Sequence, residues 1–318
     1  MRAGSIVFWF GAVVFLAAVF LMTQAVGNEY PFFAGYVILQ FVVLSVAWSI
    51  LGGYAGYVNF GTNAFFGVGV YSAVVLVKAF QAPLAAQIVV AAVVGSLLGL
   101  GVGLLTLRMR GIFFSIATIA VAIIIETAVT NWRFVGGAAG IQLQRPPVMP
   151  PFDSYVKMLF FVQALLVVIA VATTRAIQNS RIGRGLQALR DDELAAECAG
   201  VPTLRLKLLA CVISGALISA GGAPAAMYLQ YANPESAFNL NYSVSVLAMS
   251  LIGGTTHWIG PVLGAVLLGT TQQLSAVTIS SEVNVLVLGI MLVLFVVGAP
   301  KGLIGLVRRR SKLERAGS

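Results

Sequence analysis

Long apolar runs recur along almost the whole sequence and constrain the fold more than any other feature. The hydrocarbon core of a bilayer is about 30 Å thick, so a helix needs about 20 mainly apolar residues to cross it. The chain is 59% hydrophobic and only 9% charged, and its mean hydropathy is +0.98. Soluble domains use apolar and polar residues in nearly equal parts. We therefore predict an all-α, polytopic membrane protein without a separate soluble domain.

The apolar runs and their breaks predict about ten crossings in a single transmembrane domain, residues 1–318. The predicted crossings are residues 5–26, 31–51, 62–80, 84–107, 111–130, 155–174, 206–230, 242–256, 258–277 and 283–299. The first run also has the basic start of a secretory signal peptide. It is longer than the usual apolar core of such a peptide, and no clear A-x-A cleavage site follows it. We expect a retained helix.

Positive charge predicts the orientation, because cytoplasmic loops are enriched in Lys and Arg. With both termini in the cytoplasm, most of the 19 Lys and Arg residues lie on the inner side, including those of a basic tail at residues 300–318. The basic residues left on the outer side are Lys78, Arg133, Arg145 and Lys157. The net charge of +9 therefore reflects topology, and we expect a lipid bilayer and no nucleic acid as its partner. Two cysteines and one histidine are too few for a recognisable metal site.

Residues 51–69, LGGYAGYVNFGTNAFFGVG, do not have the composition of a plain membrane anchor. They place six glycines and several polar side chains at membrane depth. Irregular backbone is tolerated there only inside protein or beside a watery cavity, which predicts a broken or re-entrant element. The polar candidates for a substrate pathway are Asn59, Thr62 and Asn63. The candidate hinges are Gly56 and Gly61.

A second broken segment is predicted at Gly221, Gly222 and Pro224, because proline removes a hydrogen bond from a helix. The alternative for small residues in a membrane is close packing of helices. We favour that alternative for GSLLGLGVG, residues 95–103, where glycines recur at G-xxx-G spacing.

Two ionisable residues stand out in the predicted crossings and turns. Glu126 is the only acidic residue inside a predicted crossing, and acids in that position are costly and usually functional. It is a pathway candidate, with a structural pair to Asn131 or Arg133 as the alternative. His257 lies beside Trp258 at a turn, where a role at the membrane interface is favoured over substrate contact.

Residues 183–200, GRGLQALRDDELAAECAG, concentrate charge in a chain that has little of it. They lie in the largest predicted cytoplasmic loop, residues 175–207. We predict one short amphipathic helix over residues 186–198, which ends before Gly200 and Pro202. Two roles for this helix are open: it docks onto a soluble partner, or it is a solvated connector between crossings. We expect Cys198 to be a small residue of this helix.

Five stretches resemble, in order, the blocks of the branched-chain amino-acid ABC transporter permease family of the LivM type. They are GYAGYVNFGTNAFFGVGVY at 53–71, RMRGIFFSIATIAVA at 108–122, FVGGAAGI at 134–141, RIGRGLQALRDDELAAECAGV at 181–201 and LIGGTTHWIGPVLGA at 251–265. The fourth is similar to the coupling loop of ABC importers, which contacts the ATPase. The coupling residues that this resemblance implies are Gly183, Arg184, Arg190, Asp191, Glu193, Ala195, Ala196, Glu197 and Gly200.

The resemblance implies a bacterial inner-membrane permease that imports branched-chain or other hydrophobic amino acids. It implies as partners a second homologous permease, two cytoplasmic ATPase subunits and a solute-binding protein. The chain contains no G-x-x-x-x-G-K-[ST] motif, so we expect no cofactor here, no enzyme activity, and ATP with Mg²⁺ in the ATPases. Residues 59–62 and 255–258 depart from the family pattern, so urea, short amides and small carboxylates are alternative substrates. A secondary transporter or channel is the alternative class.

Overall fold

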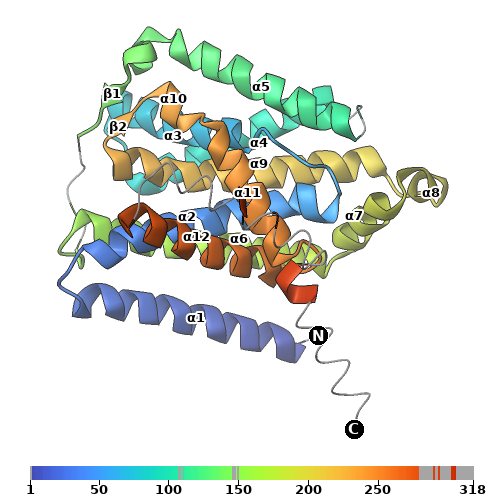
Figure 1. The fold of residues 1–318 in the computed structure, drawn as a ribbon, viewed down its shortest axis with the longest axis horizontal. Helices are drawn as coiled ribbons and strands as arrows, with labels where there is room; N and C mark the ends of the chain where they lie inside the picture. The colour runs from blue at the N-terminus through green and yellow to red at the C-terminus, as the bar shows by residue number, and fades with distance from the viewer. Residues whose placement is uncertain are drawn as a thin grey trace.

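The structure is a computed structural model that describes residues 2–106, 109, 111–144, 148, 150–278, 289–290, 293 and 302–305. Most of the described chain is helical (Figure 1). The long helices are α1 (Arg2–Ala25), α2 (Tyr30–Trp48), α3 (Thr62–Phe80), α4 (Leu84–Thr106), α5 (Ile112–Thr130), α6 (Tyr155–Gln178), α9 (Thr203–Leu229) and α12 (Ile259–Thr278). The shorter helices are the π-helix η1 (Ser49–Tyr54), the 3-10 turns η2 (Arg133–Val135) and η3 (Gly137–Ala139), α7 (Arg181–Asp191), α8 (Glu193–Cys198), α10 (Pro234–Ala237) and α11 (Leu240–Gly253). A short antiparallel ribbon pairs β1 (Ile141–Gln142) with β2 (Tyr231–Ala232).

Seven helices among the described residues are long and apolar enough to cross a membrane. They span Ser5–Ala25, Tyr30–Tyr54, Thr62–Phe80, Leu84–Thr106, Ile112–Thr130, Tyr155–Gln178 and Thr203–Leu229. This confirms the all-α, polytopic class. The predicted crossings 242–256 and 258–277 correspond to α11 and α12, which are not among the seven, and 283–299 lies almost wholly outside the described residues. The number ten stays a prediction.

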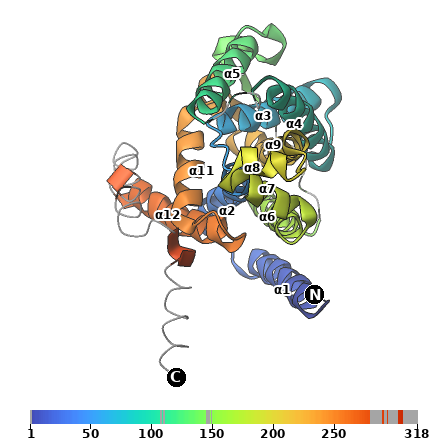
Figure 2. The same ribbon diagram turned by 90° about the vertical axis from the view of Figure 1, so that its right-hand side faces the viewer.

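Helix α9 lies at the centre of the bundle. It packs most extensively on α4 and α3 and also contacts α2 and α6. Helices α5 and α1 lie at opposite edges of the molecule (Figures 1 and 2). Both edge helices expose large apolar side chains, such as Phe10 on α1 and Ile116 on α5, as helices facing lipid do. The core is therefore organised around α9.

Small residues allow α4 and α9 to approach closely. A Cβ added at Gly95 would lie 2.3 Å from Ser219 Oγ, and one at Gly99 would lie 2.7 Å from the Cys211 carbonyl oxygen. Real Cβ atoms essentially never come this close to another heavy atom, so larger residues would force the helices apart. The packing interpretation of residues 95–103 is confirmed.

Helix α9 continues without a break through Gly221, Gly222 and Pro224. The prediction of a broken segment there was wrong. A Cβ on Gly221 would lie 3.0 Å from Val43, and one on Gly222 would lie 2.5 Å from the Phe66 carbonyl oxygen. The glycines serve close packing against α2 and α3. The neighbouring helices hold the proline-containing turn in helical form, as tertiary packing often does in membranes.

The interruption predicted in residues 51–69 is observed. Helix α2 widens into the π-helix η1, and residues 55–61 are not helical before α3 begins at Thr62. The Trp48 indole N–H donates to the Asn59 carbonyl oxygen at 2.8 Å, and Ser115 Oγ donates to the Val58 carbonyl oxygen at 2.8 Å. Side chains of neighbouring helices thus satisfy backbone groups that the break leaves free.

Replacing Gly95 with leucine is expected to destabilise the bundle, because the side chain would collide with α9. Overpacking of this kind costs about 1–3 kcal/mol, and the thermal unfolding midpoint of the detergent-solubilised protein should fall by several degrees. Gly101→Leu is the matched control on the same helix, since a Cβ there meets nothing within 4 Å. Equal midpoints for the two variants would contradict the packing described for α4 and α9.

Candidate coupling site

The charged stretch forms two helices, and the prediction of one helix over residues 186–198 was wrong. Asp192 is extended, with φ −157° and ψ 112°, and it separates α7 from α8. Its carboxylate accepts a hydrogen bond from the Ala195 N–H at 3.0 Å, which is the interaction of a helix N-cap. The first aspartate of the pair ends α7, and the second begins α8. The pair Asp191–Asp192 is the sequence signal that could have located this break.

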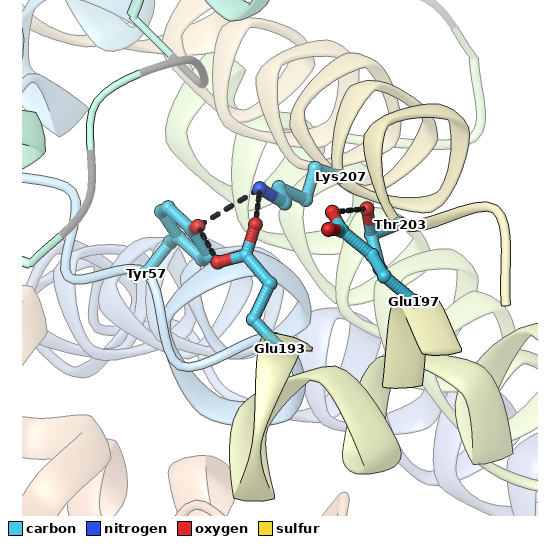
Figure 3. A network of polar contacts seen from close by, with 5 residues as sticks. All are labelled: Tyr57, Glu193, Glu197, Thr203 and Lys207. Atoms are coloured by element: carbon cyan, nitrogen blue, oxygen red, sulfur yellow. Dashed lines mark hydrogen bonds and ion pairs between the residues drawn. The ribbon is translucent and has the colours of Figure 1, made fainter. Parts of the chain in front are cut away.

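A buried polar network fixes α8 to two other elements (Figure 3). The Lys207 ammonium on α9 lies 2.5 Å from Glu193 Oε1 on α8 and 2.9 Å from the Tyr57 hydroxyl oxygen. Tyr57 donates its proton to Glu193 Oε2 at 2.7 Å, so the three side chains form a closed ring. The exposed fractions of the Lys207 and Glu193 side chains are only 4% and 15%. Burial makes each charge dependent on the other.

A second contact joins α7 to the break after α2. Arg190 Nη1 donates to the Gly53 carbonyl oxygen in η1 at 2.8 Å. Gly56 has a φ of +77°, and a Cβ there would lie 3.0 Å from Arg190 Cγ. A left-handed backbone conformation covered by a neighbouring side chain favours glycine. Between the two contacts lies a pocket of about 150 Å³, lined by Ala55, Gly56, Tyr57, Gly111, Leu189, Arg190 and Glu193.

Gln178, at the end of α6, is a site residue that the sequence did not reveal. Its Oε1 accepts hydrogen bonds from the Tyr54 hydroxyl at 3.1 Å and from the Trp258 N–H at 3.0 Å. One amide therefore joins the end of η1 to the turn between α11 and α12. No local pattern marks this residue, because its partners are far from it in the chain.

The coupling residues implied by the resemblance fall into two groups. Inward residues hold the loop to the bundle: Gly183 would place a Cβ 2.2 Å from the Ile177 carbonyl oxygen, Ala196 is buried, and Glu197 accepts from the Thr203 hydroxyl at 2.7 Å. The members that form an exposed surface are Arg184, Asp191, Ala195 and Gly200. Leu194, which was not among the expected residues, is 59% exposed.

The polar pathway candidates are buried and take part in internal hydrogen bonds. Asn59 Oδ1 accepts from the Gly61 N–H at 2.7 Å. Asn63 Nδ2 donates to the Phe238 carbonyl oxygen at 2.6 Å, and its Oδ1 accepts from the Ser243 hydroxyl at 3.1 Å. Thr62 Oγ1 lies 3.5 Å from the Asn59 carbonyl oxygen. Each has a structural partner, and a pathway role for them stays a prediction.

Glu126 and His257 lie outside the Lys207 network. Glu126 is half-buried on the edge helix α5. Its expected partner Asn131 donates instead to the Thr127 carbonyl oxygen at 2.8 Å. The ring of His257 lies 5.5 Å from that of Trp258, and its Nδ1 accepts from the Ile259 N–H at 3.3 Å. The contacts of His257 thus fix the turn that begins α12.

Comparison with known proteins places the chain in a family. Residues 30–296 match the family described as branched-chain amino acid transport system, permease component. The chain belongs to this family. It is similar to the high-affinity branched-chain amino acid transport system permease LivM of Salmonella typhimurium, with 27% identity over 300 residues, 86% of this chain and 70% of that protein. The corresponding protein of Escherichia coli K12 is 26% identical over 300 residues, which also cover 86% of this chain and 70% of that protein.

A shorter similarity extends to a second kind of permease. LivH of Salmonella typhimurium is 27% identical over 135 residues, which cover 42% of this chain and 43% of that protein. A solved structure described as an inward-facing conformation of a putative metal-chelate type ABC transporter has 14% identity, 91% coverage of this chain, 98% coverage of that chain and a TM-score of 0.49.

The buried network is expected to behave as one unit in a double-mutant cycle. Lys207→Met removes the ammonium that pairs with Glu193, and Glu193→Gln removes the carboxylate charge that pairs with Lys207. Each change should cost about 3 kcal/mol and lower the thermal midpoint by several degrees. The double variant should lose much less than the sum, because both charges of the pair are then removed together.

Asp191→Asn is the control for this cycle, because Asp191 lies in the same loop and is exposed. It should shift the midpoint only slightly. Strictly additive losses for Lys207 and Glu193 would contradict direct pairing.

Proposed function

We propose that this chain is a permease subunit of an ATP-binding-cassette importer for branched-chain or other hydrophobic amino acids in the bacterial inner membrane. The observation that carries the proposal is the α7–α8 loop, in a chain of this permease family. The loop has an exposed face at Leu194 and a buried face held by Lys207. Such a two-sided element can receive force from a soluble partner and pass it to the bundle.

The proposed assembly contains a second homologous permease, two cytoplasmic ATPase subunits and a solute-binding protein. The similarity of one chain to both LivM and LivH supports pairing between related permeases. The absence of a P-loop motif from the sequence supports the assignment of ATP and Mg²⁺ to separate subunits.

Closure of the ATPases would move α8 as a short rigid lever. Its displacement reaches the bundle by two routes: through Glu193 to Lys207 on α9, and through Arg190 to the backbone of η1. The irregular residues 55–61, with Gly56 and Gly61, lie directly beside these contacts and absorb the change in backbone angles. Helix α9 then moves as one continuous helix, which includes Gly221, Gly222 and Pro224. A path opens between the two permeases.

Leu194→Asp tests the docking face. Placing a charge in the centre of an apolar contact should reduce recovery of the ATPase subunit by at least about 10-fold in a pull-down from native membranes in mild detergent. The thermal midpoint of the permease should change little, since the side chain is exposed. Leu240→Asp is the matched control, because Leu240 is 45% exposed at the start of α11.

Two outcomes of the pull-down decide the class of transporter. If no ATPase accompanies the native chain in several detergents, the importer proposal is wrong, and ion-driven flux by the chain alone in liposomes is the next assay. If an ATPase is recovered, stimulation of its activity by binding protein loaded with leucine, or with urea or a short amide, reports the substrate class.

Labelling of Cys198 tests the orientation. Cys198 is exposed and Cys211 is buried, so a membrane-impermeant maleimide should label the chain in urea-stripped inverted vesicles and not in intact spheroplasts. Cys198→Ser should abolish that signal. Adding Ser236→Cys to this variant, at an exposed position between α9 and α11, should restore labelling from the outside only. Labelling of Cys198 in spheroplasts would reverse the assigned orientation.

A further inference from the structure

Helix α1 touches the rest of the bundle at both of its ends. Near its N-terminus, the Phe8 ring packs 5.8 Å from the Trp258 ring, and the Arg175 guanidinium lies 4.2 Å from the Phe8 ring centroid. Near its C-terminus, the Phe20 ring lies 5.9 Å from the Phe161 ring, and Gln24 Nε2 donates to the Pro151 carbonyl oxygen at 3.2 Å.

An apolar cavity of about 420 Å³ lies beside the first half of α1. Its walls come from α1, α2, α6 and α12, and almost all of its surface is hydrocarbon. Gly11 lies in the α1 wall, and a Cβ added there would meet nothing within 4 Å. Gly11 and Phe15 are exposed, so the cavity opens at the surface of helices that lie in the bilayer.

The dimensions and the charge of the cavity fit one lipid chain. Phe8 and Phe15 both line it and are seven residues apart, which is about 10 Å along a helix. One leaflet of the hydrocarbon core is about 15 Å thick. The end marked by Phe8 and Trp258 carries the Arg175 cation. Tryptophan and arginine at a helix end are typical of the headgroup level, and basic pockets between membrane helices bind anionic lipid headgroups.

We propose that this cavity binds an acyl chain of an anionic phospholipid whose phosphate lies at Arg175. The lipid completes the contact of α1 with α6 and α12, where side chains alone leave a gap. The family match begins at residue 30, so the site joins the matched permease to a helix that precedes the match. This role is separate from transport and does not depend on which substrate the permease carries.

The test compares retained lipid between variants of the protein with whatever subunits accompany it. The complex is equilibrated with phosphatidylglycerol and phosphatidylethanolamine vesicles, extracted in mild detergent, washed extensively and analysed by mass spectrometry. The native chain should retain about one more phosphatidylglycerol than Gly11→Leu, in which the new side chain occupies the cavity. Gly101→Leu is the matched control, because its open position lies outside the cavity, and it should retain lipid as the native chain does.

Arg175 tests the headgroup separately. Arg175→Gln should lose the preference for phosphatidylglycerol over phosphatidylethanolamine, and Arg175→Lys should keep it. If Gly11→Leu fails to fold, Val266→Phe fills the same cavity from α12 and should give the same loss of lipid. Equal lipid counts for the native chain and the filled variants would overturn the proposal. Release of a subunit by Gly11→Leu without any loss of lipid would also overturn it, because the cavity would then hold a protein helix.

Discussion

The close approach of α9 to α3 and α4 determines where the functional groups lie. Three glycines and a serine at these contacts, Gly69, Gly95, Gly99 and Ser219, leave no room for larger side chains. In a membrane the helices gain little from hydrophobic burial against one another, so packing of small residues carries much of their association. Because α9 is held in this way, Lys207 in its second turn has a defined position. The α7–α8 loop is then built around the buried ammonium of Lys207.

The sequence was a good guide wherever a feature depends on local composition. Apolar runs located the seven described spans, and the G-xxx-G pattern of residues 95–103 indicated packing. The cluster of charge at residues 183–200 indicated the loop in which the structure has α7 and α8. Resemblance to a family favours a docking role for that loop, which composition alone left open between a docking helix and a connector; that role stays a prediction.

Features that depend on distant partners were not readable in the same way. Tyr57 and Lys207 are separated by 150 residues, and nothing near either one indicates that they meet. Pro224 predicted a break because proline removes a helix hydrogen bond, but packing against α2 and α3 keeps the helix continuous. Glu193 was expected among charges that face a partner; instead, it neutralises a lysine inside the protein. In each case the outcome depends on tertiary contacts that the local sequence does not reveal.

The short ribbon at the other end of α9 has a consequence for the whole molecule. Strand β2 follows α9 after a single residue and pairs with β1, and the Gln230 carbonyl oxygen accepts from the Leu143 N–H at 2.7 Å. Helix α9 has 27 residues, which is about 40 Å of helix. It therefore links the α7–α8 loop at its N-terminal end to the segment between α5 and α6, which contains β1, at its C-terminal end. Thermodynamic linkage is reciprocal. If a ligand at one face shifts this helix and thereby changes the affinity for a ligand at the other face, the second ligand must change the affinity for the first by the same factor.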